Sequence, residues 1–142
     1  MIRNINRSIH YMAWMVLFIL MVMATSCEEE SGVTQDASDL TGTWVKNRYQ
    51  DYLTILSRQE DLQKDQYGFV LQPGGKFIER KNSGPCATPP ISYKNYEGTW
   101  EMLSDSLVKI RVGYWGGMMR YDMKIFQLEG DTLRIQYHYY EE

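Results

Sequence analysis

Gly42-Thr43-Trp44 recurs in the chain as Gly98-Thr99-Trp100, and these two tripeptides decide the fold. Each copy opens a run of residues that reads as a β-strand. A glycine at such a position lets another backbone or a ring come close, because it has no Cβ. A tryptophan beside it can bury about 200 Å² and close the end of a β core. We therefore predict that Trp44 and Trp100 stand at the corners of one small antiparallel barrel.

From Leu40 onward, apolar and polar residues alternate between turn signals, which is typical of short β-strands. Residues 67–71 alternate before the turn Pro73-Gly74-Gly75, and a return strand covers 77–81. The other expected strands cover 42–49, 97–103, 108–112, 119–128 and 133–139. The alternation slips at Ile125-Phe126, where both residues are apolar, and this slip predicts a β-bulge.

Residues 51–64 allow two interpretations. Tyr52, Leu53 and Leu56 fall near helical spacing, with Asp51 placed as an N-cap. The run 52–56 would also fit a strand. A short helix or an irregular segment is the preferred interpretation.

The pattern thus gives seven or eight strands joined by short turns. An open sheet of this kind would leave two unpaired edges, and such edges invite aggregation. Closure into an up-and-down barrel removes both edges. We therefore predict an all-β fold, a small antiparallel up-and-down barrel over residues 40–142. A two-sheet sandwich is the alternative.

The segment 1–26 has a different character. Arg3 and Arg7 precede an uncharged apolar run, 11–24, which is shorter than the roughly 20 residues that span a bilayer. A positive lead, a short apolar run and a small-residue exit are typical of a secretory signal peptide. The exit Met23-Ala24-Thr25-Ser26-Cys27 resembles the lipobox of bacterial lipoproteins. The resemblance implies that Cys27 is acylated and becomes the new N-terminus; an ordinary signal peptide is the alternative.

In residues 27–39, Cys27 is followed by Glu28-Glu29-Glu30 and a polar stretch without apolar periodicity, so this segment is expected to form a flexible tether. An acidic run after a lipidated cysteine resembles the export signal of Bacteroidetes-type surface lipoproteins. The resemblance implies a lipid anchor in the outer membrane, facing the periplasm or the cell surface. A merely solubilising linker is the alternative. Loss of residues 1–26 would lower the net charge from −3 to about −5, so no basic footprint for nucleic acid is expected.

The strand pattern, with Gly42-Thr43-Trp44 on the first strand, resembles the lipocalins, whose signature is a Gly-x-Trp at that place. The resemblance implies that a basic residue near the last strand packs across the tryptophan, and Arg134 is the candidate for this barrel-closing role. The segments 68–80, 86–90 and 98–100 also resemble lipoproteins of the same bacterial type.

The inward-facing rows are rich in aromatic rings and thioethers. An eight-stranded barrel either holds one small molecule or is filled by its own side chains. A solid core and an apolar pocket with tyrosine hydroxyls as polar handles therefore both remain open. The candidate pocket residues are Phe69, Tyr121, Met123, Tyr137 and Tyr139. The predicted function is binding of a small apolar or aromatic ligand; the alternative is a non-enzymatic interaction module, such as an inhibitor or accessory subunit, that works through its loops.

Two loop residues are candidate contacts. Cys86 lies in the loop 82–92, which carries three of the four prolines and is expected to be ordered. The loop could serve as a lid or a partner contact, or cap the barrel with Cys86 packed as a small hydrophobic residue. With Cys27 acylated, Cys86 would have no intramolecular disulfide partner. Trp115, in a Gly-rich turn, could display its indole to a partner or be buried in the core.

No catalytic residue, metal site or cofactor is predicted. His138 would be the only histidine left after processing, and it falls among outward positions of the last strand. The methionines lie on alternating strands and are interpreted as core residues. The expected partners are the membrane, through the lipid anchor, and a small hydrophobic ligand. The chain is expected to be a monomer that binds no nucleic acid.

Overall fold

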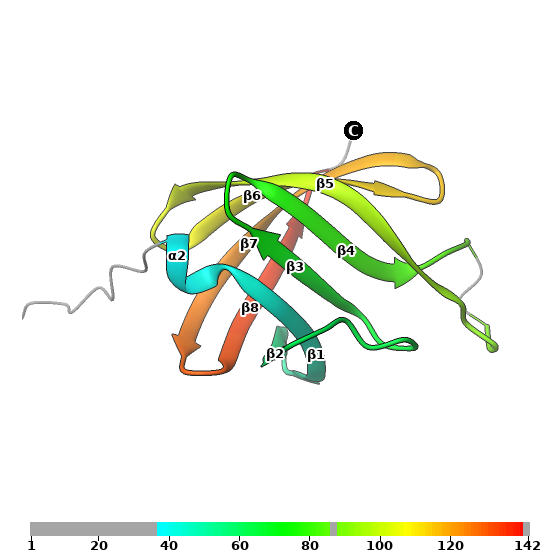
Figure 1. Ribbon diagram of the computed structural model, residues 1–142, viewed down its shortest axis with the longest axis horizontal. Helices are drawn as coiled ribbons and strands as arrows, with labels where there is room; N and C mark the ends of the chain where they lie inside the picture. The colour runs from blue at the N-terminus through cyan, green and yellow to red at the C-terminus, as the bar shows by residue number, and fades with distance from the viewer. Residues whose placement is uncertain (1–36, 86–87, 141–142) are drawn as a thin grey trace, which may run out of the picture. The chain divides into compact units, whose positions relative to one another are not determined.

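Eight antiparallel strands close into a barrel in the computed structural model, which describes residues 37–85 and 88–140 (Figure 1). The elements in chain order are α2 (Ala37–Leu40), β1 (Gly42–Gln50), β2 (Leu53–Gln59), β3 (Gly68–Gln72), β4 (Lys76–Asn82), β5 (Tyr93–Ser104), β6 (Leu107–Tyr114), β7 (Gly117–Glu129) and β8 (Thr132–Tyr139). The predicted all-β barrel is confirmed. The predicted signal peptide, Cys27, the tether up to residue 36 and Cys86 lie outside the described residues.

The strand order departs from a strict up-and-down barrel at one place. Strands β3 to β8 form a meander, and the β1–β2 hairpin closes it, because β1 pairs with β3 and β2 pairs with β8. Strands β2 and β3 are both antiparallel to β1, so the connection 60–67 must run back along the barrel. Its Leu62 packs against Gly68, where a Cβ would lie 3.0 Å from the leucine side chain.

Residues 53–59 form a strand, so the preferred interpretation of 51–64 as a helix or irregular segment was wrong. Thr54, Ile55 and Leu56 are consecutive buried residues of β2, which pairs with β1 and β8. A strand buried on both faces loses the alternation that identifies it in a sequence. Asp51 has a φ of 54° and lies in the β1–β2 turn, not at a helix start.

The two tryptophans lie at the same end of the barrel. Trp44 is 0% exposed and donates its indole N–H to the carbonyl oxygen of Leu40 at 2.9 Å. Trp100 is 8% exposed and donates to the carbonyl oxygen of Gln72, also at 2.9 Å. The first tripeptide opens β1, whereas the second lies in the middle of β5, since that strand already begins at Tyr93.

The cation that covers Trp44 belongs to Arg58, which corrects the assignment of Arg134. The guanidinium carbon of Arg58 lies 4.3 Å from the centre of the Trp44 ring, and its nitrogens donate to the carbonyl oxygens of Thr41 and Asp39. Arg134 alternates with the buried Leu133 and Ile135, so its side chain is directed to the outer face, away from the indole.

Helix α2 therefore belongs to the barrel rather than to the tether, whose predicted extent of 27–39 was too long at its end. Leu40 is fully buried, and Arg58 holds the backbone of Asp39 and Thr41. These contacts bring the start of the described chain onto the closed end of the barrel.

Candidate functional site

The end of the barrel opposite α2, called the open end below, carries inward-pointing polar and aromatic side chains. The β1–β2 turn, the segments 83–85 and 88–92 and the β6–β7 turn all lie at this end (Figure 1). The interior is thus divided into an apolar closed end and a polar, aromatic open end.

A buried carboxylate organises the open end. Glu79 lies two residues after the buried Phe77 on β4, so both side chains point into the barrel, and Glu79 is 3% exposed. One of its carboxylate oxygens accepts hydrogen bonds from the hydroxyls of Tyr67, at 2.7 Å, and Tyr121, at 3.0 Å. The hydroxyls of Tyr67 and Tyr137 are 2.8 Å apart. Because Tyr67 gives its proton to Glu79, Tyr137 is the donor in that second bond.

Lys81 completes this group, which we call the Glu79 cluster (Glu79, Lys81, Tyr67, Tyr121 and Tyr137). Its ammonium donates to the second carboxylate oxygen at 2.6 Å, and the side chains of Lys81 and Glu79 are 16% and 4% exposed. The same ammonium lies 2.9 Å from the sulfur of Met119. A buried charge is tolerated when it is paired and hydrogen-bonded, and both conditions hold here.

The tyrosine rings pack on one another as well as bonding through their hydroxyls. The ring of Tyr121 lies 5.4 Å from that of Tyr137 and 5.3 Å from that of Tyr139. Tyr137 also meets Tyr67 edge to face, with centroids 6.3 Å apart. Edge-to-face and tilted contacts at such distances are favourable, so the rings form a rigid aromatic wall.

Burial raises the pKa of Tyr67, Tyr121 and Tyr137 well above the ordinary value of 10.0, and the negative charge of Glu79 adds to the effect. For Tyr137, the hydrogen bond with Tyr67 acts in the opposite direction. Burial also raises the pKa of Tyr139, to about 12. The hydroxyls of the Glu79 cluster are therefore neutral hydrogen-bond donors at physiological pH.

Alkaline pH is expected to unfold the barrel cooperatively. The unfolded chain loses the phenol protons near pH 10 while the folded state keeps them, so the folded state binds more protons and stability falls as pH rises. Each buried tyrosine should cost about 1.4 kcal/mol of unfolding free energy per pH unit above 10. Urea unfolding from pH 8 to 11 measures this slope. Replacing Tyr137 by phenylalanine should reduce the slope, whereas replacing the exposed Tyr52 should not.

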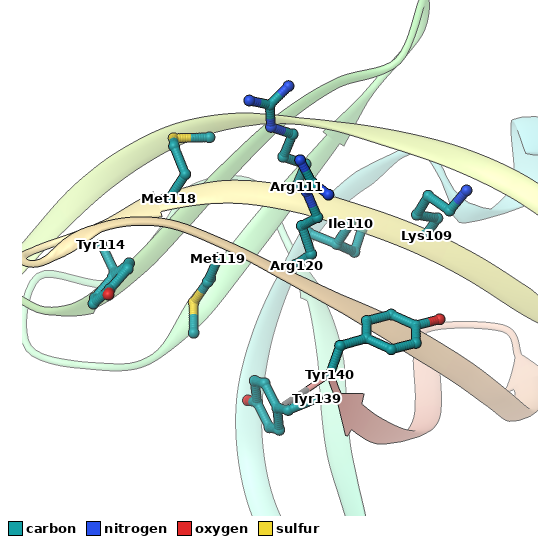
Figure 2. A pocket seen from close by; sticks show the side chains of 9 residues that line it. All are labelled: Lys109, Ile110, Arg111, Tyr114, Met118, Met119, Arg120, Tyr139 and Tyr140. Carbon is teal, nitrogen blue, oxygen red and sulfur yellow. The ribbon is translucent and has the colours of Figure 1, made fainter. Parts of the chain in front are cut away.

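A groove of about 710 Å³ lies beside the cluster, where β7 extends past the end of β8. Its lining residues come from β6, β7 and the end of the chain, and are Lys109, Ile110, Arg111, Tyr114, Met118, Met119, Arg120, Tyr139 and Tyr140 (Figure 2). Two residues connect the groove to the Glu79 cluster. Tyr139 packs on Tyr121, and the sulfur of Met119 contacts Lys81.

The structure brings three of the five predicted pocket residues together. Tyr121, Tyr137 and Tyr139 form the aromatic wall, although Tyr139 is 57% exposed at the rim. Phe69 and Met123 are fully buried in the core, and Phe69 packs on Phe77 with ring centroids 5.5 Å apart. These two residues cannot meet a ligand at the open end.

The candidate loop contact Trp115 is 55% exposed, and its ring meets Tyr114 edge to face at 5.5 Å. The interpretation of this indole as a displayed residue therefore fits the structure, and the alternative of core burial is excluded. Its neighbour Tyr114 lines the groove, so the β6–β7 turn forms part of the rim.

Sequence reasoning missed the polar members of the site. Glu79 and Lys81 carry a signal that could have found them, since they continue the inward row that starts at Phe77. An acid and a base two residues apart on an inward row indicate a buried ion pair. Arg111 and Arg120 carried no such signal, because they occupy outward positions where charged residues are expected.

Comparisons with known proteins found no matching protein-family model, curated protein or solved structure. Within residues 37–85 and 88–140, no helix is both long and apolar enough to cross a bilayer. In the same ranges, no three His, Cys, Asp or Glu side chains are grouped so that they could hold a metal ion.

Proposed function

We propose that the barrel binds a small aromatic or apolar molecule at its open end. The observation that carries this proposal is the groove, which joins thioether and phenol side chains to the aromatic wall. Pockets of this type, largely apolar with a few fixed polar groups, are typical ligand sites. The interior of the closed end is filled, so the ligand would occupy the groove and the rim rather than a central cavity.

The Glu79 cluster supports this proposal by fixing the wall. Its carboxylate and ammonium satisfy each other and the tyrosine hydroxyls, so the cluster itself offers no free charge to a ligand. A wall whose rings are already held in place loses little conformational entropy when a ligand binds.

N-phenylnaphthylamine (NPN), an uncharged aromatic probe, tests the proposal. The full-length chain should bind NPN saturably, and Tyr139→Ala should weaken binding about fivefold, because a ring contact of about 1 kcal/mol is lost. Phe126→Ala is the matched control, since Phe126 is 44% exposed on β7 and does not line the groove. Non-saturable binding, or equal losses in the two variants, would contradict the proposal.

Methionine methyl NMR gives the location of the probe independently. The methyl signals of Met118 and Met119 should shift on addition of NPN, since both residues line the groove. Those of Met102 and Met123 should stay, because they do not line it. Shifts confined to Met102 or Met123 would place the probe elsewhere.

The proposed setting of this activity is the cell envelope. The lipobox-like exit before Cys27 and the acidic run after it support a lipid anchor in the outer membrane. Cys27→Ser should abolish acylation and release the protein from the membrane fraction. Retention of the variant in that fraction would contradict the anchor.

A second candidate function is a protein interaction through the open-end connections. It is favoured by apolar residues exposed on three separate connections there: Tyr52 (67%), Ile91 (37%) and Trp115 (55%). Exposed aromatic residues of this kind are enriched at interface hot spots. Trp115→Ala should then weaken partner capture while leaving NPN binding unchanged.

A further inference from the structure

The groove has a positively charged side as well as an apolar one. Lys109, Arg111 and Arg120 line it together with Met118 and Met119. Figure 2 shows the arginine side chains rising from β6 and β7, while Met119 points to the opposite side of the ribbon. Met118 lies on the same side as the arginines, so a molecule bound on that side meets cations and an apolar thioether at the same time.

The two arginines face each other across the β6–β7 ladder. Arg111 and Arg120 are directly paired in register, and both are exposed. Like charges directly opposite on neighbouring strands destabilise a sheet. The adjacent Lys109 differs, since its cross-strand neighbours are the carboxylates Glu101 and Asp122.

In the described part of the chain, neither arginine of this pair forms an ion pair. The ion pairs found there join Arg58 to Asp131 and Lys81 to Glu79. The remaining cross-strand neighbour of Arg111 is Thr99, which carries no charge. The chain as a whole is acidic, with a net charge of −3, so the arginine pair is a local positive charge on a negatively charged protein.

We propose that the groove selects amphiphiles with one anionic head group, a carboxylate, phosphate or sulfonate. The head group would bridge Arg111 and Arg120, and the aromatic or alkyl body would lie on Met118 and Tyr140, which line the groove on the outer face together with the arginines. Guanidinium groups bind such anions through paired hydrogen bonds, and an anion placed between them removes their mutual repulsion. This inference rests on the proposed function and specifies the chemical class of its ligand.

The inference is tested with two probes that share one aromatic frame. Anilinonaphthalene sulfonate (ANS) carries an anionic group, and NPN lacks it. The full-length chain should bind ANS more tightly than NPN, and added salt should weaken ANS binding only, because exposed charges are screened. Each of Arg111→Gln and Arg120→Gln should weaken ANS binding about fivefold and leave NPN binding unchanged.

Arg48→Gln is the matched control, because it removes one exposed arginine from β1 with the same change in net charge. It should leave ANS binding unchanged. If both probes bind equally and the arginine variants affect neither, the head-group inference is wrong while ligand binding stands. If neither probe binds, the proposed function itself fails.

A further variant tests whether the arginine pair binds an anion of a ligand or a carboxylate of the chain itself. Two glutamates, Glu141 and Glu142, follow Tyr140 in the sequence. If they were the partners of the arginine pair, Arg120→Gln would destabilise the wild-type chain but not the Glu141→Gln/Glu142→Gln variant. That coupling in urea unfolding would overturn the inference, whereas equal effects in both backgrounds support an external ligand.

Discussion

Replacing Glu79 by leucine is expected to lower the free energy of unfolding by about 3–5 kcal/mol, because it leaves a buried ammonium without its counter-charge. Lys81 is only 16% exposed in its side chain and has no other carboxylate within reach in the described chain. The hydroxyls of Tyr67 and Tyr121 would lose their acceptor at the same time. Urea unfolding at neutral pH measures the loss.

The double variant Glu79→Leu/Lys81→Met separates the missing charge from lost packing. Replacing both members of a buried pair by apolar residues is often nearly neutral, so the double variant should recover much of the stability. Glu97→Gln is the control, since Glu97 is exposed on the neighbouring β5 and should change stability by less than about 0.5 kcal/mol. A double variant no more stable than Glu79→Leu would show that the charge is not the cause.

Alternation in the sequence was sufficient to predict the meander. Strands β3 to β8 correspond to the predicted runs, because each has one face in the core and one in water, and this asymmetry is written into the residue order. The β-bulge expected at Ile125-Phe126 is confirmed by the register shift between Ile125 and Gln127. The two indoles were found from the repeated Gly-Thr-Trp tripeptide rather than from alternation, because a large indole beside a glycine is suited to close packing in a β core.

The strand order that closes the barrel could not be predicted, because it depends on pairing between distant strands. β2 is buried on both faces, so its sequence shows no alternation, and its place between β1 and β8 follows from the crossover 60–67. Arg58 belongs to this ambiguous segment, and only the register that sets it beside Trp44 reveals its role.

The site was predicted in its aromatic part and missed in its charged part. Tyr121 on β7 and Tyr137 and Tyr139 on β8 all occupy inward positions of alternating strands, so a sequence pattern can group them. Arg111 and Arg120 meet only through the β6–β7 register, and no periodicity within one strand encodes that contact. Asp122 occupies an outward position but is 7% exposed, because its carboxylate accepts a hydrogen bond from Tyr140 near the chain end.

The two glycines of the repeated tripeptide are required for different reasons, and only Gly98 lies against the backbone of a neighbouring strand. Gly42 has a φ of 133°, and a Cβ there would lie 2.5 Å from the mobile end of the Arg58 side chain. Gly98 has no such backbone angle. A Cβ at Gly98 would instead lie 2.2 Å from the carbonyl oxygen of Arg111 and 2.7 Å from the Cα of Val112. These atoms belong to the backbone of β6, which cannot move aside without breaking its ladder.

Gly98→Ala is therefore expected to destabilise the barrel by about 3 kcal/mol or more, the upper range for overpacking in a core. Gly113→Ala is the matched control on the adjacent strand β6, because a Cβ there would meet its nearest neighbour, the Tyr96 ring, at an ordinary 3.5 Å. The control should change stability by less than about 1 kcal/mol. Thermal and urea unfolding of the two variants, measured together, check the difference. If Gly98→Ala were as stable as Gly113→Ala, β5 and β6 would not approach as closely as the structure requires, and the role of the second tripeptide would need another explanation.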